Sequence, residues 1–170
     1  MNAAPAPVID PLRYVPAYIN WISNKLSRGA SQHYLQHFDV GIEVWRILLL
    51  LAQHTTVSVQ DAARVIGMDK GSVSRAFKTM HARGLIALSL DAVDGRLRLA
   101  SLTRKGRALQ AQMADMAAAR EQAFLSVLSA AEREVLIDML RRLHDHLPQV
   151  EAQTQDYIQA CKPSRRKASP

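Results

Sequence analysis

Residues 58–84 read SVQDAARVIGMDKGSVSRAFKTMHARG, and the rest of the chain is best understood from how this segment is built. Ser58 followed by Asp61 resembles a capping box with Asp in place of Glu, and Gly67 is suited to end the short helix that begins there. Asp69 is a good N-cap for a second helix, which we expect to end at the last glycine of the segment. Two helices of about two and four turns, joined by two or three residues, predict a helix-turn-helix.

The residues that follow change to a strand pattern. The runs LIALSL (85–90) and LRLASL (97–102) flank the turn segment DAVDGR (91–96), whose Asp-Gly pair is typical of a β-hairpin. A helix-turn-helix followed at once by a hairpin is a winged helix. We therefore expect a mainly α fold with a small β-hairpin, in which residues 39–103 form a winged helix-turn-helix domain for binding DNA.

On the N-terminal side, the Ala- and Pro-rich residues 1–9 are expected to be disordered. Apolar residues then recur at helical spacing from about residue 17 to 36, which predicts a long amphipathic helix within segment 10–38. Residues 42–54 read as a second helix that is apolar on most of its surface and therefore largely buried.

On the C-terminal side, Thr103 can cap a long helix to about Leu128, and Ser129 with Glu132 forms a capping box for a further helix to about residue 147. Pro148 interrupts that helix, and a last helix is expected to continue to Cys161. The small winged-helix core is unable to cover the apolar stripes of all these outer helices. Segments 10–38 and 104–161 are therefore predicted to be N- and C-terminal dimerisation arms of a symmetric homodimer.

The charge of the chain is concentrated in two places. The 170 residues contain 22 Lys and Arg against 15 Asp and Glu, a formal net charge of +7. Residues 69–107 alone carry nine Lys and Arg against three Asp, and the basic tail 162–170, which we expect to be disordered, adds four more cations. A basic middle flanked by mildly acidic segments is typical of a protein that binds a polyanion, although chance clustering on a solvated surface is the alternative.

Composition excludes several classes of protein. The longest apolar run, residues 47–52, has six residues, too few to span a bilayer, and the N-terminus lacks the pattern of a signal peptide. A single cysteine excludes an internal disulfide framework and a multi-cysteine metal site, so we expect a cytoplasmic protein. No nucleotide-binding, hydrolase or metalloprotease motif is present, so we predict neither an enzyme nor a cofactor.

The second helix of the helix-turn-helix has two chemically different faces. Val73, Phe77 and Met80 form an apolar stripe, whereas the opposite face carries hydroxyls and cations with no carboxylate after Asp69. An ordinary surface helix, the alternative interpretation, usually interleaves Glu with Lys at i, i+4. A helix of this kind suits the major groove, and an arginine at the hairpin tip, held by a nearby Asp, suits the minor groove. The residues predicted to contact DNA are Ser58, Lys70, Ser72, Ser74, Arg75, Lys78, Asp94, Arg96 and Arg98.

Four motifs carry a family resemblance: DKGSVSR (69–75), RGLI (83–86), the DGR of the hairpin turn (94–96) and SLTRKG (101–106). Through them the chain resembles the MarR family of bacterial winged-helix transcription regulators, closely over about residues 39–109. The resemblance implies a homodimer on a pseudo-palindromic operator, with the recognition helix in the major groove and the wing in the minor groove. It also implies a small-ligand pocket between the dimerisation and DNA-binding regions, and repression by occluding a promoter.

The aromatic residues are unevenly distributed, since six of the nine lie between Tyr14 and Trp45. An aromatic pocket with the guanidinium of Arg46 suits a small aromatic acid or phenol. The alternative is that these rings form a dimer interface and that Arg46 pairs with Glu43 or Asp61. The predicted effector-binding residues are Tyr18, Trp21, His33, His37, Trp45 and Arg46.

His33 and His37 have the i, i+4 spacing of a metal-binding pair. Without a further histidine or a cysteine nearby, we expect no metal. The pair is then satisfied within the fold, exposed to solvent, or placed to bind a ligand carboxylate.

The sequence therefore predicts a dimeric transcription regulator, a repressor released from its double-stranded DNA operator by a small aromatic effector. The alternative is an architectural protein that binds DNA without sequence preference and without an effector. The two differ in the ratio of specific to non-specific DNA affinity.

Overall fold

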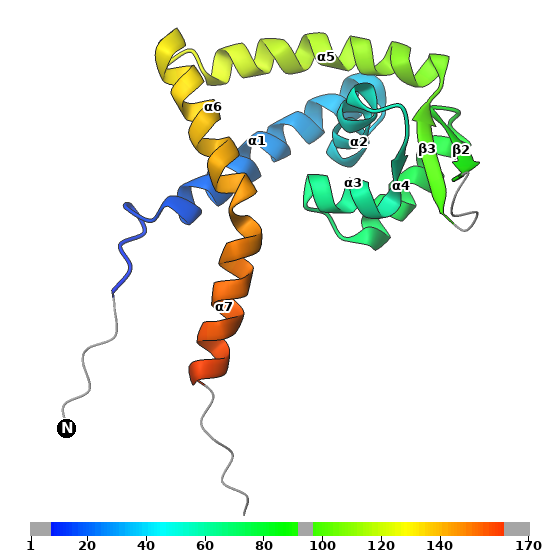
Figure 1. Cartoon of the computed structure of the whole chain (residues 1–170). Coiled ribbons are helices and arrows are strands. Elements are labelled where there is room, and N and C mark those ends of the chain that lie inside the picture. The colour runs from blue at the N-terminus through cyan, green and yellow to red at the C-terminus, as the bar shows by residue number, and fades with distance from the viewer. Residues whose placement is uncertain (1–7, 92–96, 162–170) are drawn as a thin grey trace, which may run out of the picture. The chain divides into compact units, whose positions relative to one another are not determined.

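The computed structural model describes residues 8–91 and 97–161 (Figure 1). The chain divides into two compact units, residues 1–118 and 119–170, and helix α5 runs from the first into the second. In chain order, the elements are α1 (Val15–Phe38), α2 (Ile42–Gln53), β1 (Val57–Ser58), α3 (Val59–Ile66), α4 (Lys70–Ala82), β2 (Ile86–Leu90), β3 (Arg98–Leu102), α5 (Arg104–Phe124), α6 (Ala130–Asp145) and α7 (Leu147–Cys161). Within the described residues, no helix combines the length and the hydropathy needed to cross a membrane.

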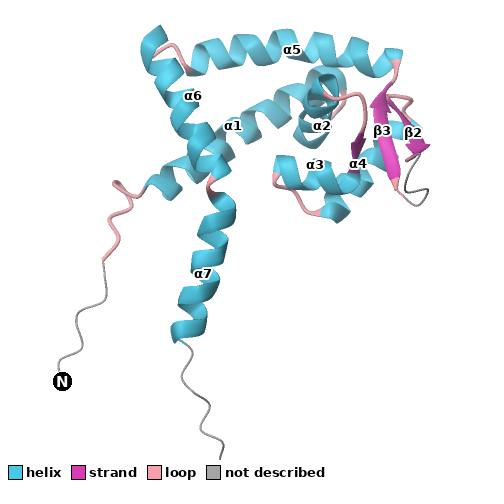
Figure 2. Ribbon diagram, viewed as in Figure 1, coloured by secondary structure: helices cyan, strands magenta, loops and turns pink. Residues whose placement is uncertain are grey.

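Helices α3 and α4 form the predicted helix-turn-helix, and local capping sets their ends (Figure 2). The Ser58 hydroxyl accepts a hydrogen bond from the backbone N–H of Asp61 at 3.0 Å and donates to the Asp61 carboxylate at 2.7 Å. Gly67 ends α3 at φ 71°, a left-handed conformation that glycine adopts at little cost. Asp69 then caps α4 by accepting from the N–H of Ser72 at 2.9 Å. The fold of this segment is therefore encoded locally, residue by residue.

The sheet of the winged helix has one strand more than the predicted hairpin. Strands β2 and β3 pair antiparallel with Leu88 opposite Ala100, and β1 pairs with the other edge of β3, giving the order β1-β3-β2. The predicted hairpin runs are confirmed at Ile86–Leu90 and Arg98–Leu102. Strand β1 escaped prediction because two residues are too few to show an alternating pattern.

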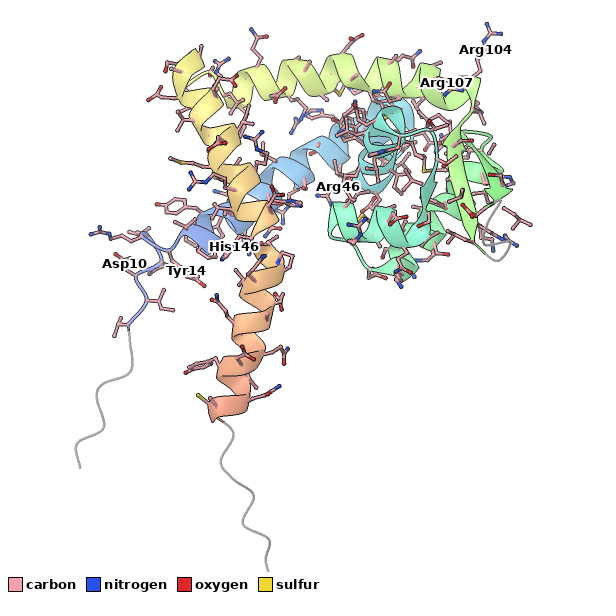
Figure 3. The ribbon with its side chains drawn as sticks, in the orientation of Figure 1. Asp10, Tyr14, Arg46, Arg104, Arg107 and His146 are labelled. Carbon is pink, nitrogen blue, oxygen red and sulfur yellow. The ribbon has the colours of Figure 1, made fainter. Side chains whose placement is uncertain are left out.

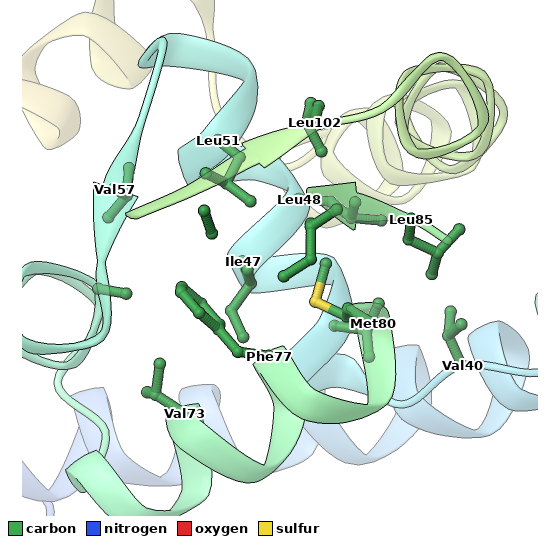
Figure 4. Packing of buried hydrophobic residues seen from close by; sticks show 14 of the residues in the cluster. Val40, Ile47, Leu48, Leu51, Val57, Val73, Phe77, Met80, Leu85 and Leu102 are labelled. Atoms are coloured by element: carbon green, nitrogen blue, oxygen red, sulfur yellow. The ribbon is translucent and has the colours of Figure 1, made fainter. Parts of the chain in front are cut away.

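The core of the first unit is assembled from α2, α4 and the sheet (Figure 4). Val73, Phe77 and Met80 point inward from α4, as their i, i+4, i+7 spacing predicts, and are almost fully buried. Ile47 and Leu48 of α2 meet them from the opposite side. This packing fixes α4 at the surface, with its remaining face turned outward.

Helix α5 begins against the end of α4, and a glycine makes the close approach possible. A Cβ atom added to Gly106 would lie 2.0 Å from the carbonyl oxygen of Leu85, far inside van der Waals contact. Thr103 caps α5 as predicted, because its hydroxyl accepts from the N–H of Gly106 at 3.0 Å. The same hydroxyl donates to the carbonyl oxygen of Gly84 at 2.7 Å. The start of α5 is thereby tied to the turn that follows α4.

Helix α1 is buried only toward its C-terminal end. Ala30 and Tyr34 join the core, whereas large apolar side chains of its first half are exposed. The helix runs slightly beyond the predicted span of about 17–36 and ends at Phe38, and its C-cap, Asp39, adopts a left-handed conformation at φ 53°. Most of the apolar surface of α1 is therefore left uncovered within a single chain.

The second unit contains α6 and α7, and neither helix has a buried residue. The Ser129–Glu132 capping box is confirmed, with both reciprocal hydrogen bonds present. Helix α5 ends at Phe124, four residues before the predicted end, and a turn follows. Pro148 does not separate the last two helices, because α7 already starts at Leu147 and holds the proline in its first turn, where its missing N–H costs nothing.

Candidate nucleic-acid interface

The outward face of α4 is cationic and rich in hydroxyls. Lys70, Ser74, Arg75 and Lys78 are all exposed, while Ser72 is half-buried. The opposite stripe of α4 is packed into the core, so this face is presented by a helix that is unable to rotate freely. Such a face can approach phosphate oxygens and base edges together.

Arg75 is held in place by a chain of hydrogen bonds along the first turns of α4. Its Nη2 donates to the Ser72 hydroxyl at 2.8 Å, and the N–H of Ser72 donates to the Asp69 carboxylate at 2.9 Å. Hydrogen bonds from Ser72 hold the pKa of the Asp69 carboxyl below its ordinary value. Ser72 therefore supports Arg75, whose side chain is exposed on this face.

Two other predicted contact residues have structural partners. Ser58 is 1% exposed, and its hydroxyl is used as the N-cap of α3, so it adds nothing to the exposed cationic face. The Lys70 ammonium donates to the Gln60 side chain of α3 at 3.3 Å, which places it beside the helix-turn-helix turn. The sequence predicted that Ser58 is a cap, but it did not reveal that its side chain is buried.

On the sheet, Arg98 is exposed opposite Leu90 in the β2–β3 register. Together with His81 of α4 it lines a small cavity of about 380 Å³ between the end of α4 and the strands. Asp94 and Arg96, the other predicted wing residues, lie outside the described residues. The interface that the structure describes therefore consists of the α4 face and Arg98.

The C-terminal end of α4 is anchored by contacts that the sequence did not reveal. The Arg83 guanidinium donates to the carbonyl oxygen of Asp39 and lies 3.4 Å from the Asp39 carboxylate, at the end of α1. Lys105 of α5 donates to the carbonyl oxygen of Arg83 at 2.9 Å. Arg83 and Lys105 lie in the motifs RGLI and SLTRKG, both of which were recognised in the sequence. Only the fold shows that the two motifs contact each other. These bonds link α4 to α1 and α5.

The predicted effector residues form two groups rather than one. Tyr18 and Trp21 are exposed and make an edge-on contact with ring centroids 5.5 Å apart. Trp45 instead packs against the buried Tyr34, with centroids 5.7 Å apart. The dimer-interface and pocket interpretations of the exposed pair both remain predictions.

Arg46 has a partner that neither sequence interpretation named. Its Nη2 donates to the Ser27 hydroxyl of α1 at 2.9 Å, rather than to Glu43 or Asp61. Figure 3 labels Arg46. Asp61 is engaged by Ser58 and Arg64, and hydrogen bonds from these two residues lower the pKa of its carboxyl. In place of the acid that the alternative interpretation named, the structure gives Arg46 a hydroxyl on the neighbouring helix as its partner.

The two histidines of α1 are exposed, and their rings stack with centroids 6.5 Å apart. Across residues 8–91 and 97–161, no group of three or more His, Cys, Asp or Glu side chains is arranged to hold a metal ion. The expected role of His33 and His37 in binding an effector stays a prediction.

Comparison with known proteins places this geometry in a family. A model described as the MarR family matches residues 38–97. A MarR/EmrR family transcriptional regulator from Acinetobacter sp. ADP1 is 32% identical, with a TM-score of 0.76 over 83% of this chain and 99% of that one. An uncharacterized HTH-type transcriptional regulator, YdgJ of Bacillus subtilis (strain 168), is 27% identical over 110 residues, 62% of this chain and 65% of YdgJ, just under two thirds of that relative.

A third relative has a known small-molecule response. Bordetella bronchiseptica BpsR, whose DNA binding is regulated by 6-hydroxynicotinic acid, is 25% identical, with a TM-score of 0.67 over 78% of this chain and 94% of that one. The winged helix, the match of the family model, and a relative 32% identical that the chain covers almost completely agree. The chain belongs to the MarR family, whose members are transcription regulators rather than enzymes.

Proposed function

We propose that the protein is a homodimeric repressor that binds a pseudo-palindromic DNA operator and is released from it by a small aromatic acid or phenol. The observation that carries the DNA-binding part is the exposed face of α4, with Arg75 held by Ser72 and Asp69. Because the opposite stripe of α4 is locked into the core, little order is lost when this face meets a groove. Its site of action is the DNA of the cytoplasm.

The homodimer is supported by the apolar residues that one chain leaves exposed. Tyr18, Ile19 and Ile22 of α1, and Leu140 and Leu143 of α6, are all more than a third exposed. Exposed apolar helix faces of this kind mostly mark interaction sites. In a symmetric pair, two recognition helices about 34 Å apart would contact successive turns of one face of DNA.

The effector is supported by the exposed aromatic pair of α1 and by the regulation of BpsR by an aromatic acid. Tyr18 and Trp21 offer ring faces to a flat ligand, and a carboxylate would reach a cation such as Arg46 only by competing with Ser27. Titration of aromatic acids and phenols against the protein–operator complex tests this part. If no compound of a broad panel releases DNA, the effector class is wrong.

The DNA-binding part is tested by selecting bound sequences from a random duplex library. The affinity for the selected site is then measured against random DNA at physiological salt. We expect a ratio of about a thousandfold or more for a specific regulator. A ratio near one would instead support an architectural protein.

Arg75→Ala provides the residue-level test. Losing one good guanidinium contact to a base or phosphate should weaken operator affinity by about tenfold to a hundredfold. Arg141→Ala removes the same charge from α6, where Arg141 pairs with Asp138, and should change affinity little. Equal losses in both variants would show that general charge, and not the α4 face, carries the binding.

A further inference from the structure

We propose that His81 of α4, Ser89 of β2 and Arg98 of β3 bind one phosphodiester of the DNA backbone, and that protonation of His81 strengthens this contact as the pH falls. The site is the cavity of about 380 Å³ between the end of α4 and the strands. The inference rests on the proposed function, because it names a further part of the DNA-binding surface and a regulation of it. The sequence predicted neither His81 nor Ser89 as a contact residue.

His81 continues the exposed face of α4 by one turn. Ser74, Lys78 and His81 follow one another at i, i+4 and i+7, so their side chains lie along one side of the helix. All three are exposed, whereas Val73 and Phe77 belong to the stripe that is buried in the core. The imidazole of His81 therefore extends the row of residues that we expect to contact DNA.

The cavity brings together three elements, and each contributes a different group. Helix α4 supplies the imidazole of His81, β3 supplies the guanidinium of Arg98, and β2 supplies Ser89 between Leu88 and Leu90. Helix α4 packs against β2 (Figure 1), and β2 pairs with β3 so that Leu90 lies opposite Arg98. The site is therefore built on regular elements that are packed against one another.

The lining suits a phosphodiester, which has charged oxygens flanked by the apolar carbons of two sugars. The guanidinium of Arg98 and the hydroxyl of Ser89 are donors for the oxygens. Leu88 and Leu90 offer apolar surface to the sugars, and Leu90 is 63% exposed in the free chain. Among the described residues that line the cavity, none is an acid that would repel the phosphate.

The two cationic side chains of the cavity are not engaged elsewhere in the described chain. Across residues 8–91 and 97–161, His81 and Arg98 make no side-chain hydrogen bond or ion pair. Arg83, two residues after His81, instead donates to the carbonyl oxygen of Asp39 and pairs with its carboxylate. A phosphate can thus accept from His81 and Arg98 without breaking a bond between described residues.

The position of the cavity matches the course of a DNA strand. One sugar-phosphate strand separates each major groove of DNA from the minor groove beside it. In the proposed complex, α4 lies in the major groove and the end of the β2–β3 hairpin lies in the adjacent minor groove. The strand between the two grooves then crosses the surface between α4 and the hairpin, where the cavity lies.

The imidazole makes this contact dependent on pH. A histidine gains its proton between about pH 5 and pH 8, whereas an arginine keeps its charge over this range. A protonated imidazole donates from both ring nitrogens and adds a positive charge opposite the phosphate. The other charged groups of the elements that meet at this end of α4 are Lys78, Arg83, Arg98, Lys105, Asp39 in its pair with Arg83, and Asp91 directly after β2. We therefore expect operator affinity to rise as the pH falls.

The experiment measures the affinity of the full chain for its selected operator duplex by fluorescence anisotropy at constant ionic strength. We expect the wild type to bind about threefold to tenfold more tightly at about pH 6 than at about pH 8. The dependence of affinity on salt should also be steeper at the lower pH, by up to about one counterion, because one more phosphate is neutralised.

Three variants assign the pH dependence to His81. His81→Gln should lose both differences between the two pH values. His81→Lys carries a permanent charge and should bind at both pH values about as tightly as the wild type does at the lower one. His146→Gln removes an exposed imidazole that follows α6 and should keep the pH dependence of the wild type. Circular dichroism melts of all three should match the wild type, because both histidines are exposed.

A second set of duplexes identifies the partner of His81 as a backbone phosphate. Each phosphate of one operator half-site is replaced in turn by an uncharged methylphosphonate. At one position this replacement should remove the pH dependence of the wild type. At the same position it should leave the affinity of His81→Gln as independent of pH as before.

The possible failures are distinguishable. The inference is overturned if His81→Gln keeps the pH dependence of the wild type, or if no methylphosphonate position removes it. If the operator is bound specifically but equally well at both pH values, the proposed function stands and the inference is wrong. If no duplex is bound specifically at either pH, the proposed function fails, and the inference fails with it.

Discussion

The winged helix and the two C-terminal helices use their apolar residues in opposite ways. In the winged helix, Ile47, Val73 and Met80 are completely buried, whereas Leu140 and Leu143 of α6 are about half exposed. Both regions contain a helix with a side-chain N-cap, α4 in the winged helix and α6 near the C-terminus. The two regions therefore do not differ in how their helices are capped. The winged helix therefore closes its core within one chain, while α6 and α7 carry apolar faces whose burial must come from elsewhere.

The largest expected effect comes from truncating one phenylalanine in the core of the winged helix and one at the end of α5, just before the C-terminal helices. Phe77 is 4% exposed in the core, so Phe77→Ala should lower the free energy of unfolding by about 3–5 kcal/mol. Phe124→Ala, at the end of α5, removes the same atoms from a side chain that is 42% exposed and should cost much less. Urea denaturation followed by circular dichroism measures both. Equal losses would show that the region around Phe124 is as well packed as the winged helix.

The next effect tests what covers α6. Leu140→Glu combined with Leu143→Glu places two charges on its exposed apolar face and should raise the dimer dissociation constant by about a hundredfold or more. Arg141→Glu combined with Arg142→Glu adds the same acids without removing apolar surface, and should leave the dimer intact. The molar mass of each variant in solution is measured by multi-angle light scattering over a concentration series. An unchanged dimer in the leucine variant would place the interface on other helices.

Sequence patterns predicted the winged helix better than the side-chain partners within it. Ser58, Gly67 and Asp69 marked the ends of α3 and α4 because capping acts between residues two to four apart in the chain. The bond from Arg83 to Asp39 joins residues 44 apart, and that from Arg46 to Ser27 joins residues 19 apart. No local pattern specifies such pairs, because they depend on how the helices pack.

The same reason explains why the candidate effector residues fell into two groups. Helical spacing correctly placed Tyr18 and Trp21 side by side on α1. Spacing within one helix gives no information about its neighbour, and Trp45 turned out to pack on Tyr34. A cavity lined by Leu51, Leu102 and Arg107 escaped prediction for the same reason, since it is built from α2, β3 and α5.

A smaller effect compares the same cap in the two regions. Ser58→Ala removes a buried hydroxyl that satisfies the N–H of Asp61, whereas Ser129→Ala removes an exposed one from the start of α6. We expect a loss of about 2 kcal/mol for Ser58→Ala and about 0.5–1 kcal/mol for Ser129→Ala. The two losses in the free energy of unfolding are measured by thermal or urea unfolding. A larger cost at Ser129 would mean that the start of α6 is buried in the assembled protein.

The smallest effect is the contribution of two carboxylates to stability at low pH. Hydrogen bonds from Ser72 lower the pKa of Asp69, and hydrogen bonds from Ser129 lower that of Glu132. The unfolded chain binds these protons at the ordinary pKa values, 3.8 and 4.5, whereas the folded chain binds them only at lower pH. Stability from both groups is therefore fully present above the ordinary values and is lost as the pH falls through the folded ones. Asp69→Asn and Glu132→Gln should each lower the melting temperature slightly at pH 7, where the charged form is the stabilised one, and flatten its fall between about pH 5 and pH 2, because neither replacement titrates. A fall as steep as in the wild type would mean that other carboxylates govern the acid transition. If only Asp69→Asn flattens the curve, the winged helix alone limits acid stability, and the capping of α6 is unimportant to it.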